Sequence, residues 1–144
     1  RDGCRTPMAW DASPGAGFSD AEPSAFWLPL HPDHATLNVA TQSADPDSPL
    51  AFYRRALAVR QASPSLQSGD YAPLDDVPDD VFAFTRGGDT LVLLHLGDGT
   101  AEVAVPEAFR GGTVRLATDR AAEGTEAAAV VTLGPWAGVV LVSS

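Results

Sequence analysis

Apolar and polar positions alternate in the second half of the chain, which predicts short β-strands. The alternation is clearest over residues 81–85, and residues 91–96 form a largely apolar run. Gly87, Gly88 and Asp89 lie between these two segments and are typical of a hairpin turn. Further candidate strands, separated by glycine-containing turns, are residues 101–105, 113–117, 129–133 and 138–142. About six strands at this spacing predict an antiparallel sandwich or barrel.

One amphipathic helix is predicted over residues 49–61. Asp47 or Ser48 can cap its N-terminus, and Pro49 suits the first helical position because its missing N–H is not needed there. The helical pattern ends at the Ser-Pro pair of residues 63–64. The apolar face consists of Leu50, Tyr53 and Leu57, flanked by Phe52, Ala56 and Val59. A helix with one apolar face needs a partner surface.

Residues 1–46 follow neither period. They are rich in Pro, Gly, Ser and Asp, and their aromatic residues are irregularly spaced: Trp10, Phe18, Phe26 and Trp27. Structureless loops beyond about 15 residues are uncommon inside a free-standing domain, whereas disordered segments contain few aromatic residues. We therefore expect an ordered, elaborate loop that rests on a body absent from this sequence.

Composition narrows the choice of partners. The net charge of −10 and the pI near 4.4 argue against nucleic acid, because phosphate binding draws on clustered Lys and Arg. No apolar run approaches the roughly 20 residues of a membrane-spanning helix, so no membrane contact is expected. Cys4 is the only cysteine, which excludes an intrachain disulfide and a thiolate metal cluster and favours a reducing, cytoplasmic compartment. No cofactor or metal site is expected in this segment.

The opening segment is the most specific signal. Residues 1–11 read R-D-G-C-R-T-P-M-A-W-D, and Ala16, Gly17 and Phe18 follow. This segment resembles the one after the eighth barrel strand in alpha-glucosidases and oligo-1,6-glucosidases of the alpha-amylase family (glycoside hydrolase family 13). Further landmarks follow in the family's order at residues 27–29, 38–39, 45–48, 52–55, 59–60, 69–71 and 82–86. The resemblance is strong through residue 86 and architectural beyond it.

The resemblance implies a fold class of α/β plus all-β. Residues 1–46 are then the long loop after strand eight of a TIM (β/α)8 barrel, residues 49–61 are its last helix, and an antiparallel β-sandwich C-terminal domain follows. We place the domain boundary between residues 64 and 65, which gives domains 1–64 and 65–144. Because barrel active sites are built from the loops after the strands, residues 1–46 are the part that can contact substrate.

The family's chemistry is retaining hydrolysis or transfer at an alpha-glucosidic bond, with a carboxylate nucleophile and a carboxylic acid about 5 Å apart. No Asp or Glu here matches those motifs, so we expect no catalytic residue in this chain and no activity from it alone. The expected partner is the N-terminal catalytic barrel portion of the same enzyme, where a structural calcium ion can also bind. Arg1 matches the family arginine that holds the nonreducing terminal glucose, because a guanidinium fork can bond a hydroxyl and a carboxylate together.

Four other residues are candidates for loop bracing or for the pocket wall. We favour bracing for Arg5, and Asp2 can orient either arginine. Met8 and Trp10 could line a sugar subsite, but an aromatic beside a proline in a long loop is more often part of a small local core. We therefore favour a core position for Trp10, and for Trp27 as well.

Alternative functions stay open at this point. Trehalose synthases and sucrose isomerases of the same family share the R-T-P-M-x-W motif, so transfer competes with hydrolysis. A non-catalytic carbohydrate-binding β-sandwich module is an alternative of another class. Its support is thin, because only Phe109 and Trp136 are aromatic beyond residue 86. A third alternative is an acidic interaction domain, which no specific residue supports.

Overall fold

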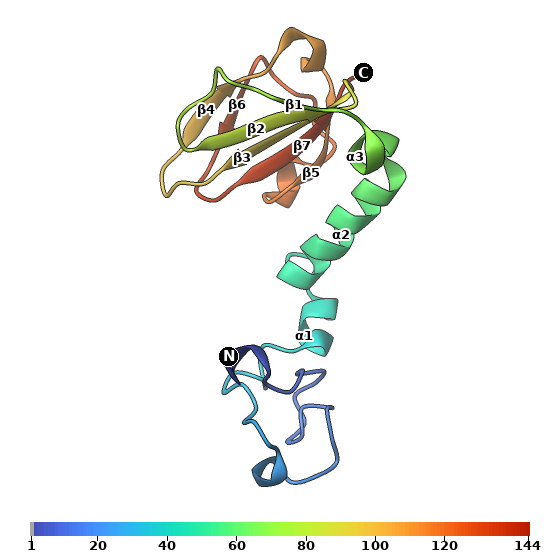
Figure 1. The fold of residues 1–144 in the computed structure, drawn as a ribbon, viewed down its shortest axis with the longest axis vertical. Helices are drawn as coiled ribbons and strands as arrows, with labels where there is room; N and C mark the ends of the chain where they lie inside the picture. The colour runs from blue at the N-terminus through green and yellow to red at the C-terminus, as the bar shows by residue number, and fades with distance from the viewer. Residues whose placement is uncertain (1) are drawn as a thin grey trace. The chain divides into compact units, whose positions relative to one another are not determined.

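The computed structural model describes residues 2–144, apart from the side chain of Asp2, and Arg1 lies outside the described residues. Contacts within the chain define two compact units, one ending at Arg54 and the other running from Arg55 to Ser144 (Figure 1). The domain boundary expected between residues 64 and 65 stays a prediction.

The second unit is an antiparallel β-sandwich. Its larger sheet has the strand order β1-β2-β3-β7-β5 and its smaller sheet pairs β4 with β6 (Figure 1). The strands are β1 (Tyr71–Pro73), β2 (Val81–Arg86), β3 (Thr90–His95), β4 (Ala101–Ala104), β5 (Thr113–Ala117), β6 (Val130–Leu133) and β7 (Gly138–Val142). The sandwich expected from the alternation is confirmed, and β5 and β7 have the expected bounds. Strand β1 was not predicted, because it has three residues and includes a proline, which cannot donate to a sheet.

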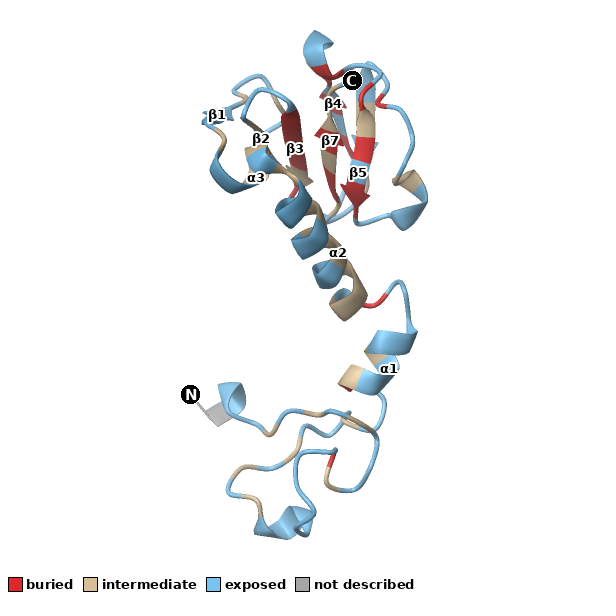
Figure 2. Cartoon of the chain, turned by 90° about the vertical axis from the view of Figure 1, so that its right-hand side faces the viewer, coloured by how far each residue is buried: buried red, intermediate tan, exposed pale blue. Residues whose placement is uncertain are grey.

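Side chains from both sheets form one hydrophobic core. Leu91 and Leu93 of β3 and Leu141 of β7 are fully buried, and Val103 of β4 and Leu133 of β6 pack in the same cluster (Figure 2). Consecutive residues of β3 point to opposite faces of the sheet, and nearly all of them are buried, which explains why its sequence is apolar almost throughout. Each fully buried leucine contributes about 1.5–3 kcal/mol relative to an exposed one.

His95 is a polar side chain buried at the end of β3. Its Nδ1 lies 2.7 Å from the carbonyl oxygen of Gly134 and its Nε2 lies 3.0 Å from Oδ2 of Asp80. Both partners accept hydrogen bonds, which favours a ring protonated on both nitrogens. The Gly134 carbonyl raises the pKa of His95, burial opposes this, and Asp80 adds to the increase. A Cβ on Gly97 would lie 2.8 Å from both Asp80 Oδ2 and His95 Nε2, so glycine leaves room for the pair.

The raised pKa of His95 predicts that the sandwich loses stability as pH rises. The protonated ring contributes fully below its ordinary pKa of 6.5, and the contribution disappears as pH rises through the higher folded-state pKa. Asp80→Asn is expected to narrow the pH range over which this stability is lost, because a neutral amide no longer favours the imidazolium. Asp79→Asn is expected to leave that pH range unchanged. Urea unfolding over a pH series measures the effect. Stability that rises across the same window would mean that His95 is buried as the neutral ring.

Helix α2 (Pro49–Ala62) begins where the sequence predicts. Ser48 is its N-cap: its Oγ accepts a hydrogen bond of 3.1 Å from the amide of Ala51. Two of the three residues of its expected apolar face lack cover within this chain, since Tyr53 is 63% exposed and Leu57 is 43% exposed. The half-buried apolar residues of α2 include Leu50 and the three flanking residues Phe52, Ala56 and Val59. Shorter helices are α1 (Val39–Ala44) and α3 (Pro64–Ser68), with 3₁₀ turns at Asp2–Cys4, Pro23–Ala25, Glu107–Phe109 and Arg120–Ala122.

The first unit has little hydrophobic core of its own. Among its described residues, Ala16 alone is both hydrophobic and buried. Figure 2 shows most of the loop as exposed or half-buried. Trp27 is 87% exposed and Trp10 is 51% exposed. The expectation that these two tryptophans fill a small local core is therefore wrong. Burial of apolar surface is the main force that stabilises folded chains, so a loop with exposed aromatics has little apolar burial of its own to stabilise it.

Candidate functional site

The opening motif is tied to the N-terminus of helix α1. The carbonyl oxygens of Ala9 and Trp10 accept hydrogen bonds of 3.0 and 2.9 Å from the amides of Val39 and Ala40. These are the first two amides of α1, which have no partner within the helix. The motif backbone therefore satisfies the helix donors, and in return the helix fixes the path of residues 9 and 10.

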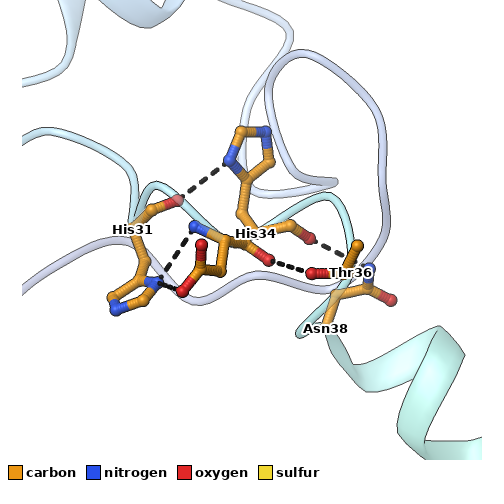
Figure 3. Close-up of polar contacts among 5 residues, drawn as sticks. His31, His34, Thr36 and Asn38 are labelled. Carbon is orange, nitrogen blue, oxygen red and sulfur yellow. Dashed lines mark hydrogen bonds and ion pairs between the residues drawn. The ribbon is translucent and has the colours of Figure 1, made fainter.

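Asn38 completes this joint as the N-cap of α1. It is buried; its Oδ1 accepts a hydrogen bond of 2.9 Å from the amide of Thr41, and its Nδ2 donates one of 3.0 Å to the carbonyl of His34. Figure 3 shows that the turn before it is braced locally, with His34 Nδ1 directed at the carbonyl oxygen of His31, 2.9 Å away. Both histidines thus make contacts that shape this turn.

Asn38→Ala is expected to destabilise the loop by about 0.5–2 kcal/mol, the usual cost of losing a helix N-cap. Asn38→Asp keeps the acceptor and should recover much of the loss. Thr36→Ala is the matched control, because Thr36 is exposed and donates one hydrogen bond of 3.2 Å to the carbonyl of Asp33. Thermal unfolding of the full-length protein provides the measurement. Equal effects of the Asn38 and Thr36 substitutions would contradict the role given to the cap.

The A-G-F part of the motif is a turn that folds back on Trp10. The amides of Trp10 and Asp11 both donate to the carbonyl oxygen of Ala16, at 2.8 and 3.3 Å. Gly17 has a φ of +64°, and a Cβ there would lie 2.8 Å from Asp11 Oδ2 and 3.0 Å from Trp10 Cβ. Only glycine satisfies both constraints without strain. The glycine of the motif therefore serves the shape of the loop.

Asp11 braces the same turn. Its Oδ1 accepts hydrogen bonds from the hydroxyl and the amide of Ser13, at 2.5 and 2.9 Å. These bonds lower the pKa of Asp11, the side-chain bond more than the backbone bond. Because these hydrogen bonds stabilise the ionised form, this carboxylate is suited to bracing the loop and poorly suited to donating a proton.

A pocket of about 240 Å³ opens within the first unit. It is lined by Arg5, Thr6, Pro7, Met8, Phe18, Phe26, Trp27 and Leu28. The rings of Phe18 and Phe26 meet edge to face with centroids 5.8 Å apart. Among the described residues, the lining includes one guanidinium and no carboxyl group. Such a wall can hold the apolar face of a sugar ring and bond its hydroxyls, but it supplies neither an acid nor a nucleophile.

The structure brings together two of the five candidate site residues. Arg5 and Met8 line the pocket, whereas Trp10 is not in the lining. Arg1 and the side chain of Asp2 lie outside the described residues, so their roles stay predictions. Sequence reasoning did not assign the other apolar lining residues Phe18, Phe26, Trp27 and Leu28 to a pocket. Phe18 carried a signal, because it ends the A-G-F motif.

The part of the chain that the structure describes has neither a metal-binding cluster nor a membrane-spanning helix. No group of three or more His, Cys, Asp or Glu side chains is placed to hold a metal ion. Within the same residues, no helix combines the length and apolar character that crossing a membrane requires. Cys4 is an exposed free thiol. The cytoplasmic location and the lack of a cofactor stay predictions.

Two known families match consecutive parts of the chain. Residues 1–69 match the family described as "Alpha amylase, catalytic domain". Residues 67–140 match the family described as "Domain of unknown function (DUF3459)". The loop, α1 and α2 thus fall in the first match, and the sandwich falls in the second except for the last two residues of β7.

Similar proteins of known name extend these matches. The chain is 51% identical over 70 residues to a probable alpha-glucosidase of Rhizobium meliloti, covering 49% of this chain and 12% of that protein. It is 35% identical over 107 residues to the probable oligo-1,6-glucosidase 2 of Bacillus subtilis, covering 73% of this chain and 18% of the relative. The glucan 1,6-alpha-glucosidase of Streptococcus pneumoniae is 37% identical over 108 residues, which cover 73% of this chain and 19% of the relative. The chain spans less than a fifth of the length of these relatives.

A solved structure resembles nearly the whole chain. The trehalulose synthase from Pseudomonas mesoacidophila MX-45 superposes with a TM-score of 0.84 at 29% identity. The alignment covers 99% of this chain and 26% of that chain.

Proposed function

We propose a function from one premise: this chain belongs to the alpha-amylase family of glycoside hydrolases and corresponds to a C-terminal segment of such an enzyme. The whole protein is an exo-acting, retaining alpha-glucosidase that cleaves short alpha-glucosides from the nonreducing end. The observation that carries this proposal is the opening motif, because residues 1–69 match the catalytic domain and relatives with similar sequences are named glucosidases.

The chain's share of the work is binding and support. Retaining hydrolysis needs a nucleophile and an acid about 5 Å apart, and we assign both to the catalytic portion outside this chain. Arg1 holds the terminal glucose, and Arg5 and Met8 contribute to the wall of the loop pocket. Support for this division comes from the pocket lining, which among the described residues contains a cation and apolar side chains.

The catalytic portion is also the partner that covers exposed apolar side chains in the loop and on strands β1 and β2 of the sandwich. In the loop these include Trp27, at 87% exposed. On the sandwich, Tyr71 and Phe82 flank Phe84 at ring-centroid distances of 5.3 Å, and Tyr71 and Phe82 are 53% and 45% exposed. Apolar patches of this kind mark interaction surfaces. The relatives are more than five times longer than the matched segment, so they have ample chain to supply the cover.

Incubation of the full-length enzyme with isomaltose, maltose and sucrose tests the proposal. Release of glucose, first detected by NMR as the alpha anomer, is the expected result, because a retaining mechanism preserves the configuration at the anomeric carbon. No glucose from any of the three substrates would remove the proposal. Release of the beta anomer would keep the glucosidase but reject the retaining mechanism.

Isomerisation is the second candidate function. It is favoured by the similarity to a trehalulose synthase, which extends over 99% of this chain. Analysis of the products from sucrose separates the two: hydrolysis gives glucose and fructose, whereas an isomerase gives a different disaccharide. The related trehalose synthase alternative predicts a new disaccharide from maltose. A stand-alone carbohydrate-binding module is not proposed, because Phe109 is buried and cannot form a binding face with Trp136.

A further inference from the structure

Trp136 adopts a backbone conformation that is costly for a bulky residue. It lies in the turn between β6 and β7 with a φ of 52°, a region that glycine or asparagine enters more easily. Its side chain is 63% exposed, so the indole gains little from burial. Strained residues of this kind are retained where the surrounding structure forces them and often serve a function. Burial of the indole therefore does not explain why a tryptophan occupies this strained position.

The indole is held in one orientation by contacts with the turn that follows β3, at Gly97 and Asp98. Its Nε1 donates a hydrogen bond of 2.8 Å to Oδ1 of Asp98, and its backbone amide donates one of 3.1 Å to the carbonyl of Gly97. Gly134, in the same turn as Trp136, is held by buried His95, whose Nδ1 lies 2.7 Å from the carbonyl oxygen of Gly134. A side chain fixed before binding loses little conformational entropy when a ligand arrives.

A groove of about 440 Å³ lies beside this indole and is lined in part by the end of β5 and by β6. Thr118, Asp119 and Thr132 bring hydroxyl and carboxyl groups to it. Thr118 Oγ1 accepts a hydrogen bond of 3.1 Å from the amide of Gly138, which leaves its hydroxyl proton available to donate. The volume falls within the range of small-ligand sites, about 300–1,000 Å³.

We propose that the Trp136 groove binds a chain of glucose units. The face of an indole carries partial negative charge and attracts the C–H bonds on one face of a sugar ring. The surrounding hydroxyl and carboxylate groups suit the sugar hydroxyls, which both donate and accept hydrogen bonds. The choice of glucose as the sugar rests on the proposed function, whereas the aromatic platform and the groove do not.

Affinity electrophoresis of the full-length protein in gels containing dextran or soluble starch tests this site. Trp136→Ala is expected to weaken binding about tenfold, the effect of deleting one aromatic contact together with its buried area. Trp136→Phe keeps a flat face and should retain most of the binding. Val130→Ala shortens an exposed apolar side chain of β6 that does not line the groove, and it is expected to change nothing. The two polymers distinguish α-1,6-linked from α-1,4-linked chains.

Trp136→Gly separates binding from folding, because glycine relieves the strained turn yet removes the platform. It should bind as weakly as Trp136→Ala while keeping the wild-type melting temperature. Wild-type protein retarded by neither polymer, or variants that bind like the wild type, would overturn the site. A large fall in melting temperature for both variants with unchanged retardation would make Trp136 a packing residue. Hydrolysis of p-nitrophenyl alpha-glucoside is assayed in parallel: its failure would reject the glucosidase but leave a Trp136-dependent retardation standing.

Discussion

Arg1→Ala in the full-length enzyme is expected to lower kcat/KM for isomaltose about 100-fold. Hydrogen bonds to charged groups contribute about 1.5–3 kcal/mol each, and 1.4 kcal/mol corresponds to a factor of ten. Arg1→Lys should rescue little of the loss, because an ammonium group cannot reproduce the planar fork of a guanidinium. Steady-state kinetics of the three proteins gives the answer.

The control for Arg1 is Arg54→Ala. Arg54 is an exposed residue of α2 whose Nη1 lies 3.4 Å from Oγ of Ser43, a long contact of small energetic value. Its kcat/KM should stay within about twofold of the wild type, as expected for a surface substitution. If the two arginine variants behave alike, or if Arg1→Ala lowers only the melting temperature, Arg1 does not bind the sugar.

Leu93→Ala is expected to destabilise the sandwich by about 2–5 kcal/mol, because it removes fully buried methyl groups and leaves a cavity. Leu93 lies on the central strand β3 and packs with core residues from both sheets. Leu96→Ala is the matched control at 56% exposure and should change stability by less than about 0.5 kcal/mol. Urea unfolding measures both. Similar values for the two leucines would contradict the position of the core.

The sandwich could be predicted from the sequence because its strands carry local signals. Residues 113–117 and 138–142 are bounded by glycine-containing turns, and the observed strands β5 and β7 have those bounds. The exposed face of α2 could not be predicted in the same way. Periodicity identifies Tyr53 and Leu57 as apolar and co-facial, but burial depends on whether a partner surface is present, and in this chain both are exposed.

The candidate sites were predictable only in part. The motif made Arg5 and Met8 candidates for loop bracing or the pocket wall, and both line the loop pocket. Trp10 was misplaced because its surroundings depend on the turn at Ala16 and Gly17, whose positive φ angles follow from three-dimensional packing. The Trp136 groove was missed for a related reason. A tryptophan with a φ of 52° has no signature in the sequence, since its neighbours Gly134 and Pro135 indicate a turn but not which way the indole points.

The central claim is that the opening loop keeps its shape through contacts with the catalytic portion of the enzyme. Amide hydrogen exchange in the 144-residue chain alone and in the full-length protein tests it most directly. We expect the amides of Val39, Ala40 and Thr41 to exchange freely in the isolated chain and slowly in the full-length enzyme, with the amides of β3 protected in both. Equal protection of the three loop amides in both proteins would contradict the claim, because the loop would then be stable without its proposed partner.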